Sequence, residues 1–379
     1  AATGAVQWKR GDNTEVIIEG LYSKATTVRD ENYISALSFS RTGAAGKAQS
    51  IIRSGEVNSQ NELVYGVFDQ VDMRIESRHD ELKTTFYQYN TILKHSLSDR
   101  FRVEAYVGYA KSKFESPAQN TIVLDRLNSN GFSWDYRQND RAPIINWGFD
   151  PSLASNWSFT NGASDVRLRQ NFVNNDFLSA KLAGDWDATD NIKLRLGGEY
   201  RRFRYDTFES RRFTAETASG TLTPAQISAL TVPFTGITGD PAYNSFRIPS
   251  LQGFIDTLGI YCNCLTTING QAVDFRVNDR NVAGVRPNVT AASNTGNILE
   301  TEKALWFQTD FNFALGDITL RGDAGVRFVH TDQTSFGYGL GNGVATPVTV
   351  KRGYDNWLPS MNLVAELTPS VLVRFGAAK

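Results

Sequence analysis

Residues 132–159 bring flat aromatic rings and planar polar side chains close together in the sequence. The aromatic members are Phe132, Trp134, Tyr136, Trp147, Phe149, Trp157 and Phe159, and the polar members are Asp135, Arg137, Asp140, Arg141, Asn146 and Asp150. Aromatic rings stack on the apolar faces of sugars, while Asp, Asn and Arg side chains bond the hydroxyl groups. The same set suits a flat aromatic chelate. The candidate ligand-binding residues are therefore Trp134, Tyr136, Trp147, Trp157, Arg137 and Arg141. In the alternative interpretation, the rings pack the segment against itself or form an aromatic girdle at a membrane surface.

Residue types that usually carry catalysis are scattered. His79, His95 and His330 are far apart, and neither a Gly-x-Ser-x-Gly nor a His-Glu-x-x-His motif occurs. Cys262 and Cys264 have no further metal ligands nearby, so we expect a local disulfide or a free pair at a loop tip. We therefore predict that the chain is not an enzyme and holds neither a cofactor nor a metal.

Composition narrows the class of protein further. Lys and Arg number 39 against 40 for Asp and Glu, a net charge of -1, which does not predict nucleic-acid binding. Among the 379 residues no run approaches the roughly 20 apolar residues that a spanning helix needs, so a helical membrane protein is excluded. Aromatic residues make up 12% of the chain, which suits a barrel with aromatic girdles.

Five pairs of strand-like segments are each joined by a short turn. The turns lie at Gly11-Asp12-Asn13, Ser98-Asp99-Arg100, Asp187 to Asn191, Gly316-Asp317 and Thr368-Pro369-Ser370. Gly, Asp, Asn and Ser supply the positive φ or the local hydrogen bonds that tight turns need. We therefore predict about ten antiparallel strands with all the short turns at one end.

The predicted strands are apolar on one face and polar on the other. From Phe101 to Ala110 the odd positions are Phe, Val, Ala, Val and Tyr, whereas the even positions include Arg102 and Glu104. A soluble antiparallel sandwich also alternates, but its strands average about 5–6 residues. These segments run for about a dozen residues, and membrane strands need about 9–11. Strand length therefore favours an all-β transmembrane barrel whose charged face lines a wet lumen.

Long stretches separate the hairpins at the other end. They are Thr26–Thr85, Glu115–Asp176, Thr207–Glu302 and Gln333–Lys351. Within them we expect strand extensions at Leu63–Phe68 and Asn120–Leu127, and a short helix at Thr223–Leu230 with Thr223 as its N-cap. No segment has a compact pattern of its own with a linker, so we expect one domain.

Segments spread over nearly the whole chain resemble the barrel of TonB-dependent outer-membrane receptors. They are AVQWKRGDNTEVIIEGLYSKATTVRDE, ALSFSR, YGVFDQVDMRIESRHDELKTTFYQ, VGYAKSKFESP, LRLGGEYRRFRYDT, GDITLRGDAGVRFVHTDQTS and YDNWLPSMNLVAELTPSVLVRFGAAK. The last combines a Leu-Pro-Ser-x-Asn-Leu strand, a short turn and an Arg-Phe-x-Ala strand. The resemblance is weakest in Thr214–Ala292.

The resemblance implies a barrel of about 22 strands, filled by an N-terminal plug with a segment that binds the inner-membrane energising protein TonB. Such receptors lie in the outer membrane of Gram-negative bacteria and import large scarce nutrients such as siderophore-bound iron or oligosaccharides. No plug is recognisable, so we expect residues 1–379 to be an internal fragment of the barrel, without plug or C-terminal strands. The short turns would then face the periplasm and the long loops the outside.

The resemblance also suggests a role for five arginines at and after the third predicted hairpin. Arg201, Arg202, Arg204, Arg211 and Arg212 could attract an anionic ferric chelate, or could pair with acidic groups facing the lumen. Two other functions remain open. One is a passive porin, and the other is a soluble β-rich domain that binds or hydrolyses carbohydrate.

Overall fold

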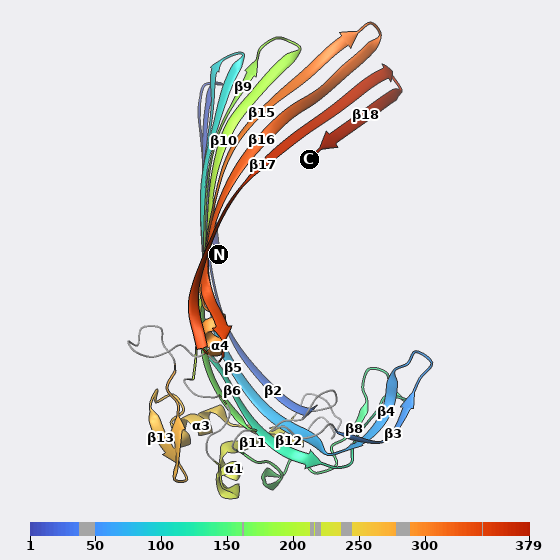
Figure 1. The fold of residues 1–379 in the computed structure, drawn as a ribbon, viewed down its shortest axis with the longest axis vertical. Coiled ribbons are helices and arrows are strands. Elements are labelled where there is room, and N and C mark those ends of the chain that lie inside the picture. The colour runs from blue at the N-terminus through green and yellow to red at the C-terminus, as the bar shows by residue number, and fades with distance from the viewer. Residues whose placement is uncertain are drawn as a thin grey trace.

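Ten long strands form one antiparallel sheet (Figure 1). The computed structural model describes residues 1–37, 50–160, 163–212, 216, 221–235, 245–277, 289–342 and 344–379. The strands are β1 (Ala2–Arg10), β2 (Thr14–Leu37), β5 (Val71–Ser98), β6 (Phe101–Ser129), β9 (Asp165–Asp187), β10 (Ile192–Arg211), β15 (Gly296–Leu315), β16 (Ile318–Gly341), β17 (Val344–Thr368) and β18 (Val371–Ala378). They are hydrogen-bonded in chain order, and the sheet is not closed, with β1 and β18 at its edges.

All five predicted hairpins are confirmed. Short turns join β1 to β2, β5 to β6, β9 to β10, β15 to β16 and β17 to β18, and they lie at one end of the sheet. Gly11 and Gly316 sit in two of these turns with φ of 57° and 65°, the left-handed region that a side chain disfavours. We call this end the turn end and the other the loop end.

The strands extend further toward the loop end than the sequence pattern predicts. The eight strands β2, β5, β6, β9, β10, β15, β16 and β17 are 20 to 29 residues long. The expected loop Gln333–Lys351 is wrong, because β16 and β17 stay paired from Gln333↔Arg352 to Gly341↔Val344. The strand was not predicted because glycine at positions 337, 339 and 341 has no side chain, so the sequence shows no alternation of apolar and polar residues there. The backbone of these glycines still pairs with β17.

Small elements gather at the loop end. A four-stranded sheet contains β3 (Ile51–Val57), β4 (Leu63–Asp69), β7 (Phe132–Asp135) and β8 (Ile144–Asn146). Two hairpins follow, β11 (Thr231–Thr235) with β12 (Ser245–Pro249) and β13 (Leu265–Ile268) with β14 (Gln271–Asp274), together with η2 (Ala154–Asn156), α1 (Pro224–Leu230), α3 (Leu251–Leu258) and α4 (Val289–Ser293). The expected strands at Leu63–Phe68 and Asn120–Leu127 and the helix are confirmed. Thr223 caps α1 reciprocally with Gln226.

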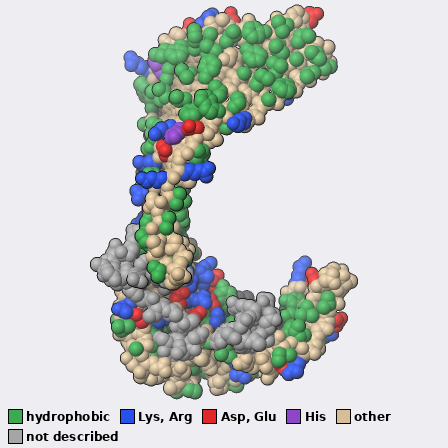
Figure 2. Space-filling model, viewed as in Figure 1, with side chains coloured by type: hydrophobic (Ala, Val, Ile, Leu, Met, Phe, Trp, Pro, Cys, Tyr) green, Lys and Arg blue, Asp and Glu red, His purple; other side chains and the backbone are tan. Residues whose placement is uncertain are grey.

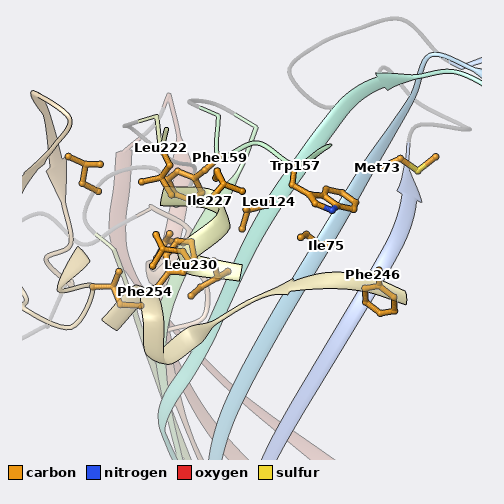
Figure 3. Packing of buried hydrophobic residues seen from close by; sticks show 14 of the residues in the cluster. Met73, Ile75, Leu124, Trp157, Phe159, Leu222, Ile227, Leu230, Phe246 and Phe254 are labelled. Atoms are coloured by element: carbon orange, nitrogen blue, oxygen red, sulfur yellow. The ribbon is translucent and has the colours of Figure 1, made fainter. Parts of the chain in front are cut away.

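The hydrophobic core lies at the loop end and on one side of the sheet. Ile75 of β5 and Leu124 of β6 are fully buried there, against the segment that carries α1 and α3. Figure 3 shows Leu230 and Phe254 of this segment gathered with Phe159 beside the long strands. The described residues from 221 to 277, between β10 and β15, therefore pack over one face of the sheet.

Candidate functional site: an exposed apolar band and the loop end

One face of the sheet is apolar and uncovered over its turn-end half. We call this face the outer face and this region the apolar band. Its members include Val6, Ile18, Leu93, Val103, Ala105, Val107, Leu182, Leu196, Leu305, Phe307, Val326, Phe328, Met361, Leu363 and Phe375. The strand register joins them across the ladder, as in Val6↔Ile18, Ala105↔Leu182, Phe307↔Val326 and Leu363↔Phe375. Figure 2 shows hydrophobic side chains gathered over this half of the sheet.

The apolar band is more exposed than is usual for a surface that faces water. Leu182, Leu196 and Leu305 each expose about 60% of their area, with values of 59%, 63% and 65%. Monomeric soluble proteins rarely show contiguous apolar patches beyond a few hundred Å². On β6 the band runs from Phe101 to Tyr109, and on β15 from Leu305 to Leu315. These stretches have the length, about 9–11 residues, that a tilted strand needs to cross hydrocarbon.

Aromatic side chains mark both borders of the apolar band. At the turn-end border the outer face carries Trp8, Phe101, Trp186, Phe313 and Phe375, and at the loop-end border it carries Tyr22, Tyr87, Tyr109, Tyr200 and Trp357. Rings with one polar edge sit well where hydrocarbon meets water. Among the described residues, no helix has the length and apolar character to cross a membrane.

The opposite, inner face of the same strands carries charges of both signs. Arg195 contacts Asp310 at 2.8 Å, and Glu199 receives Arg327 at 2.7 Å. These side chains alternate with members of the apolar band along β10 and β15, so the two faces of the sheet have opposite character. Such alternation is typical of strands with hydrocarbon on one side and a wet interior on the other.

At the loop end the ion pairs of the inner face become buried. Asp80 is fully buried and bonds both Arg29 and Arg78. Asp125 is also fully buried, and its Oδ1 accepts from Arg74 Nε at 3.0 Å. Burial raises the pKa of Asp125 to about 6, although Arg74 opposes the shift.

The predicted aromatic residues divide into buried and accessible ones. Trp147 and Trp157 expose only 8% and 3% of their area, and Trp157 Nε1 donates to the carbonyl of Pro151 at 2.9 Å. Trp134 is half-buried, and its ring centroid lies 4.7 Å from that of Phe68. The alternative reading, in which the rings pack the segment against itself, therefore describes Trp147 and Trp157. Both rings also belong to a buried cluster that includes Leu230 and Phe254, and local sequence spacing gives no sign of these distant contacts.

The remaining three candidates lie at the surface. Tyr136 exposes 38% of its area, and Arg141 is exposed with its backbone N–H bonded to Asn139. Arg137 forms a fork on Asp135 and also contacts Glu56 at 3.0 Å. Hydrogen bonds from Arg137 lower the pKa of Asp135 to about 2. Tyr136 and Arg141 are thus the members of the set that present free surface.

The five arginines near β10 do not form one cluster. Arg201 pairs with Glu199 on the inner face, whereas Arg202 lies on the outer face and is exposed. Arg204, also on the outer face, pairs with Asp206 at 2.8 Å. Arg211 bonds Glu209, and Arg212 is buried at 1% exposure. Their side chains therefore act at different places rather than together.

Histidine and cysteine side chains are engaged locally. His79 and His330 each contact an aspartate, Asp30 at 2.7 Å and Asp355 at 2.6 Å. A disulfide joins Cys262 to Cys264. Within the described ranges, no group of three or more His, Cys, Asp or Glu residues is placed to hold a metal ion.

Comparison with known proteins decides the family. The family described as TonB dependent receptor-like, beta-barrel matches residues 114–379. The chain belongs to this family. This match confirms the resemblance seen in the sequence. No curated protein matches the chain.

Solved structures of two receptors align with this chain. The ferric-catecholate import receptor Fiu from E. coli K12 is 12% identical in its closed form, with 99% of this chain and 47% of that chain covered and a TM-score of 0.36. Its open form is 13% identical, with 99% of this chain and 51% of that chain covered and a TM-score of 0.35. The siderophore receptor PiuA from Acinetobacter baumannii is 7% identical, with 96% and 46% covered and a TM-score of 0.33. The chain spans about half the length of these receptors.

Proposed function

We propose that this chain is an arc of the β-barrel of an outer-membrane receptor that imports a large, scarce nutrient with energy supplied through TonB. The cargo is of the ferric siderophore or oligosaccharide class. Transport involves no covalent chemistry. The plug that binds TonB lies in a part of the receptor outside residues 1–379.

The apolar band is the observation that carries this proposal. A surface of exposed Leu, Val and Phe side chains with aromatic residues at both borders fits hydrocarbon with water on each side. The charged inner face fits a lumen that is wet or filled by a plug. The family match over residues 114–379 adds the receptor class. A soluble carbohydrate-active domain would leave the apolar band exposed to water.

Cargo capture is proposed for the accessible part of the loop end. Tyr136 offers a ring that stacks on a sugar or an aromatic chelate, and the guanidinium of Arg141 binds hydroxyl or anionic groups. Beside Tyr136 in the chain, Trp134 packs on Phe68 and Arg137 is bonded to Asp135. Since Trp147 and Trp157 are buried, they are left out of the contact set.

The test uses the full-length receptor in its host. Cells that lack the gene are complemented with it and given labelled ferric chelates and oligosaccharides, with and without a functional TonB. We expect saturable uptake of one class that disappears without TonB. Uptake that persists without TonB would instead show a passive porin, and recovery of the protein from the soluble fraction would refute a membrane receptor.

Cargo binding to the purified receptor tests the capture surface. Replacing Tyr136 or Arg141 by Ala should weaken binding about tenfold, as for interface residues worth more than about 1 kcal/mol. Tyr261→Ala is the control, because Tyr261 is an exposed aromatic residue, at 47%, on the segment that covers the outer face. Equal affinities for all three variants would contradict the proposed surface.

A further inference from the structure

An apolar groove crosses the apolar band where β6, β9, β10 and β15 lie side by side. Its volume is about 1070 Å³, slightly above the roughly 300–1,000 Å³ typical of small-molecule sites. Small outer-face residues form its floor, namely Ala105, Ala180, Gly184 and Gly198. The groove is therefore part of the surface that we place in hydrocarbon.

Strand register explains the shape of the groove. Each small residue faces a larger one across the ladder, as in Ala180↔Tyr200, Gly184↔Leu196 and Gly198↔Leu305. Large side chains thus form the walls and glycine or alanine the floor. A Cβ added at Gly198 would lie 3.3 Å from Leu305 Cδ2, so a larger residue there would fill the space. Along β9 the outer-face order is Ala180, Leu182, Gly184, so small and large residues also alternate along the strand and the small ones lie diagonally across neighbouring strands.

Cationic groups lie at the loop-end border of the groove. Lys303 lines the groove and is the cross-strand neighbour of Tyr200. Arg202 follows Tyr200 by two residues on the same outer face, so it is a diagonal neighbour of Lys303, about 7–8 Å away by Cα spacing.

Acidic side chains of the protein neutralise these two cations only weakly. Lys303 Nζ is 3.9 Å from Asp332, in a pair with both side chains more than half exposed. Arg202 is exposed, and within the described ranges its guanidinium makes no ion pair. His330, which also lines the groove, is already bonded to Asp355.

We propose that the groove binds an acyl chain of a phosphate-bearing lipid and that Arg202 and Lys303 bind its phosphate. The apolar floor continues the lipid-facing surface, so a chain that enters it leaves no polar group in hydrocarbon. The planar guanidinium of Arg202 matches two phosphate oxygens, and Lys303 adds a point charge. The loop-end border is the side that faces outward, so the lipid belongs to the outer leaflet. This inference rests on the proposed membrane placement and not on the cargo.

Three probes distinguish binding of the lipid's acyl chain from binding of its phosphate. The full-length receptor in a neutral detergent is titrated with phosphatidic acid, with diacylglycerol of the same chains, and with inorganic phosphate, and bound lipid is counted by native mass spectrometry. We expect one phosphatidic acid to bind at least tenfold more tightly than diacylglycerol, and inorganic phosphate to bind weakly. Equal binding of the two lipids, or full competition by inorganic phosphate, would overturn the proposal. No binding by either lipid, as when a second copy of the chain covers the groove, would also overturn it.

Matched variants locate the site. Arg202→Gln should weaken phosphatidic acid binding about tenfold, since a hydrogen bond to a charged group is lost. Ala180→Leu should weaken both lipids by filling the groove. Arg204→Gln is the control, because Arg204 lies on the same face two residues further along and already pairs with Asp206. Unchanged affinity in Arg202→Gln, or an equal loss in Arg204→Gln, would refute the assignment. Recovery of each variant from the membrane fraction reports separately on the proposed placement.

Discussion

Arg212→Met tests how the segment between β10 and β15 is held on the outer face. Arg212 is 1% exposed, and its guanidinium donates to the carbonyl of Asp274 at 2.9 and 2.7 Å and to that of Val166 at 3.1 Å. It also lies 5.0 Å from the ring of Phe275. One side chain therefore joins the end of β10 to β9 and to the end of β14.

The expected cost follows from these bonds. Hydrogen bonds to a charged group contribute about 1.5–3 kcal/mol each, and methionine leaves the two buried carbonyls without this donor. Burial of the guanidinium has a desolvation cost, which also lowers the pKa of Arg212. The methionine variant does not have this cost, so part of the lost hydrogen-bond energy is offset. We therefore expect about 3 kcal/mol of local destabilisation.

Hydrogen exchange of the full-length receptor measures this opening directly. A change of about 3 kcal/mol corresponds to roughly 100-fold faster exchange in residues 265–277. Arg276→Met is the control in the same segment, since Arg276 is half-exposed and pairs with its near neighbour Asp274 at 2.9 Å. Exposed pairs contribute about 0–1 kcal/mol, so its exchange should change less than about fivefold. Exchange in Arg212→Met within fivefold of the wild type would refute the reasoning.

Three other predictions concern the apolar band, the buried carboxyl and the core. Leu305→Arg should destabilise the barrel in bilayers by about 2–4 kcal/mol, whereas Gln308→Arg on the inner face should be tolerated; equal denaturant midpoints would place Leu305 away from lipid. The raised pKa of Asp125 means that its proton stabilises the folded state, and this contribution is lost as the pH rises through about 6. Amide exchange at the Asp125–Ser158 bridge should therefore become about tenfold faster between pH 5 and 7.5, after correction for intrinsic rates, and Asp125→Asn should remove this dependence; a persistent dependence in Asp125→Asn would assign it elsewhere. Trp157→Ala should cost about 3–5 kcal/mol in the loop-end core, seen as loss of protease resistance in residues 221–277, and unchanged cleavage would contradict its burial.

Local sequence patterns were sufficient for the hairpins and their faces. The tight turns require a positive φ at Gly11 and Gly316, and glycine adopts it without a steric penalty. Such glycines therefore predict a turn from the local sequence alone. Alternation along β6 likewise separates Val103 from Arg102, because successive side chains of a strand point to opposite faces.

The length of the strands and the burial of the aromatic residues depend on contacts between distant parts of the chain. Past the apolar band the outer face of β5 and β6 becomes apolar again at Ile75 and Leu124, and the sequence does not show that α1 and α3 cover it. The same cover buries Trp157, which local spacing had grouped with the accessible Tyr136. Covering partners more than 50 residues away leave no periodic signal of their own.

The segment carrying α1 and α3 also enlarges the molecule sideways. It packs on the outer face, beyond the loop-end border of the apolar band, so in the proposed membrane placement it projects over the neighbouring membrane surface rather than across the lumen. In a crowded membrane, this overhang would set a minimum spacing between the proposed barrel wall and other proteins on that side. In that placement, lipid headgroups beneath it would be shielded from large molecules that arrive on the loop-end side.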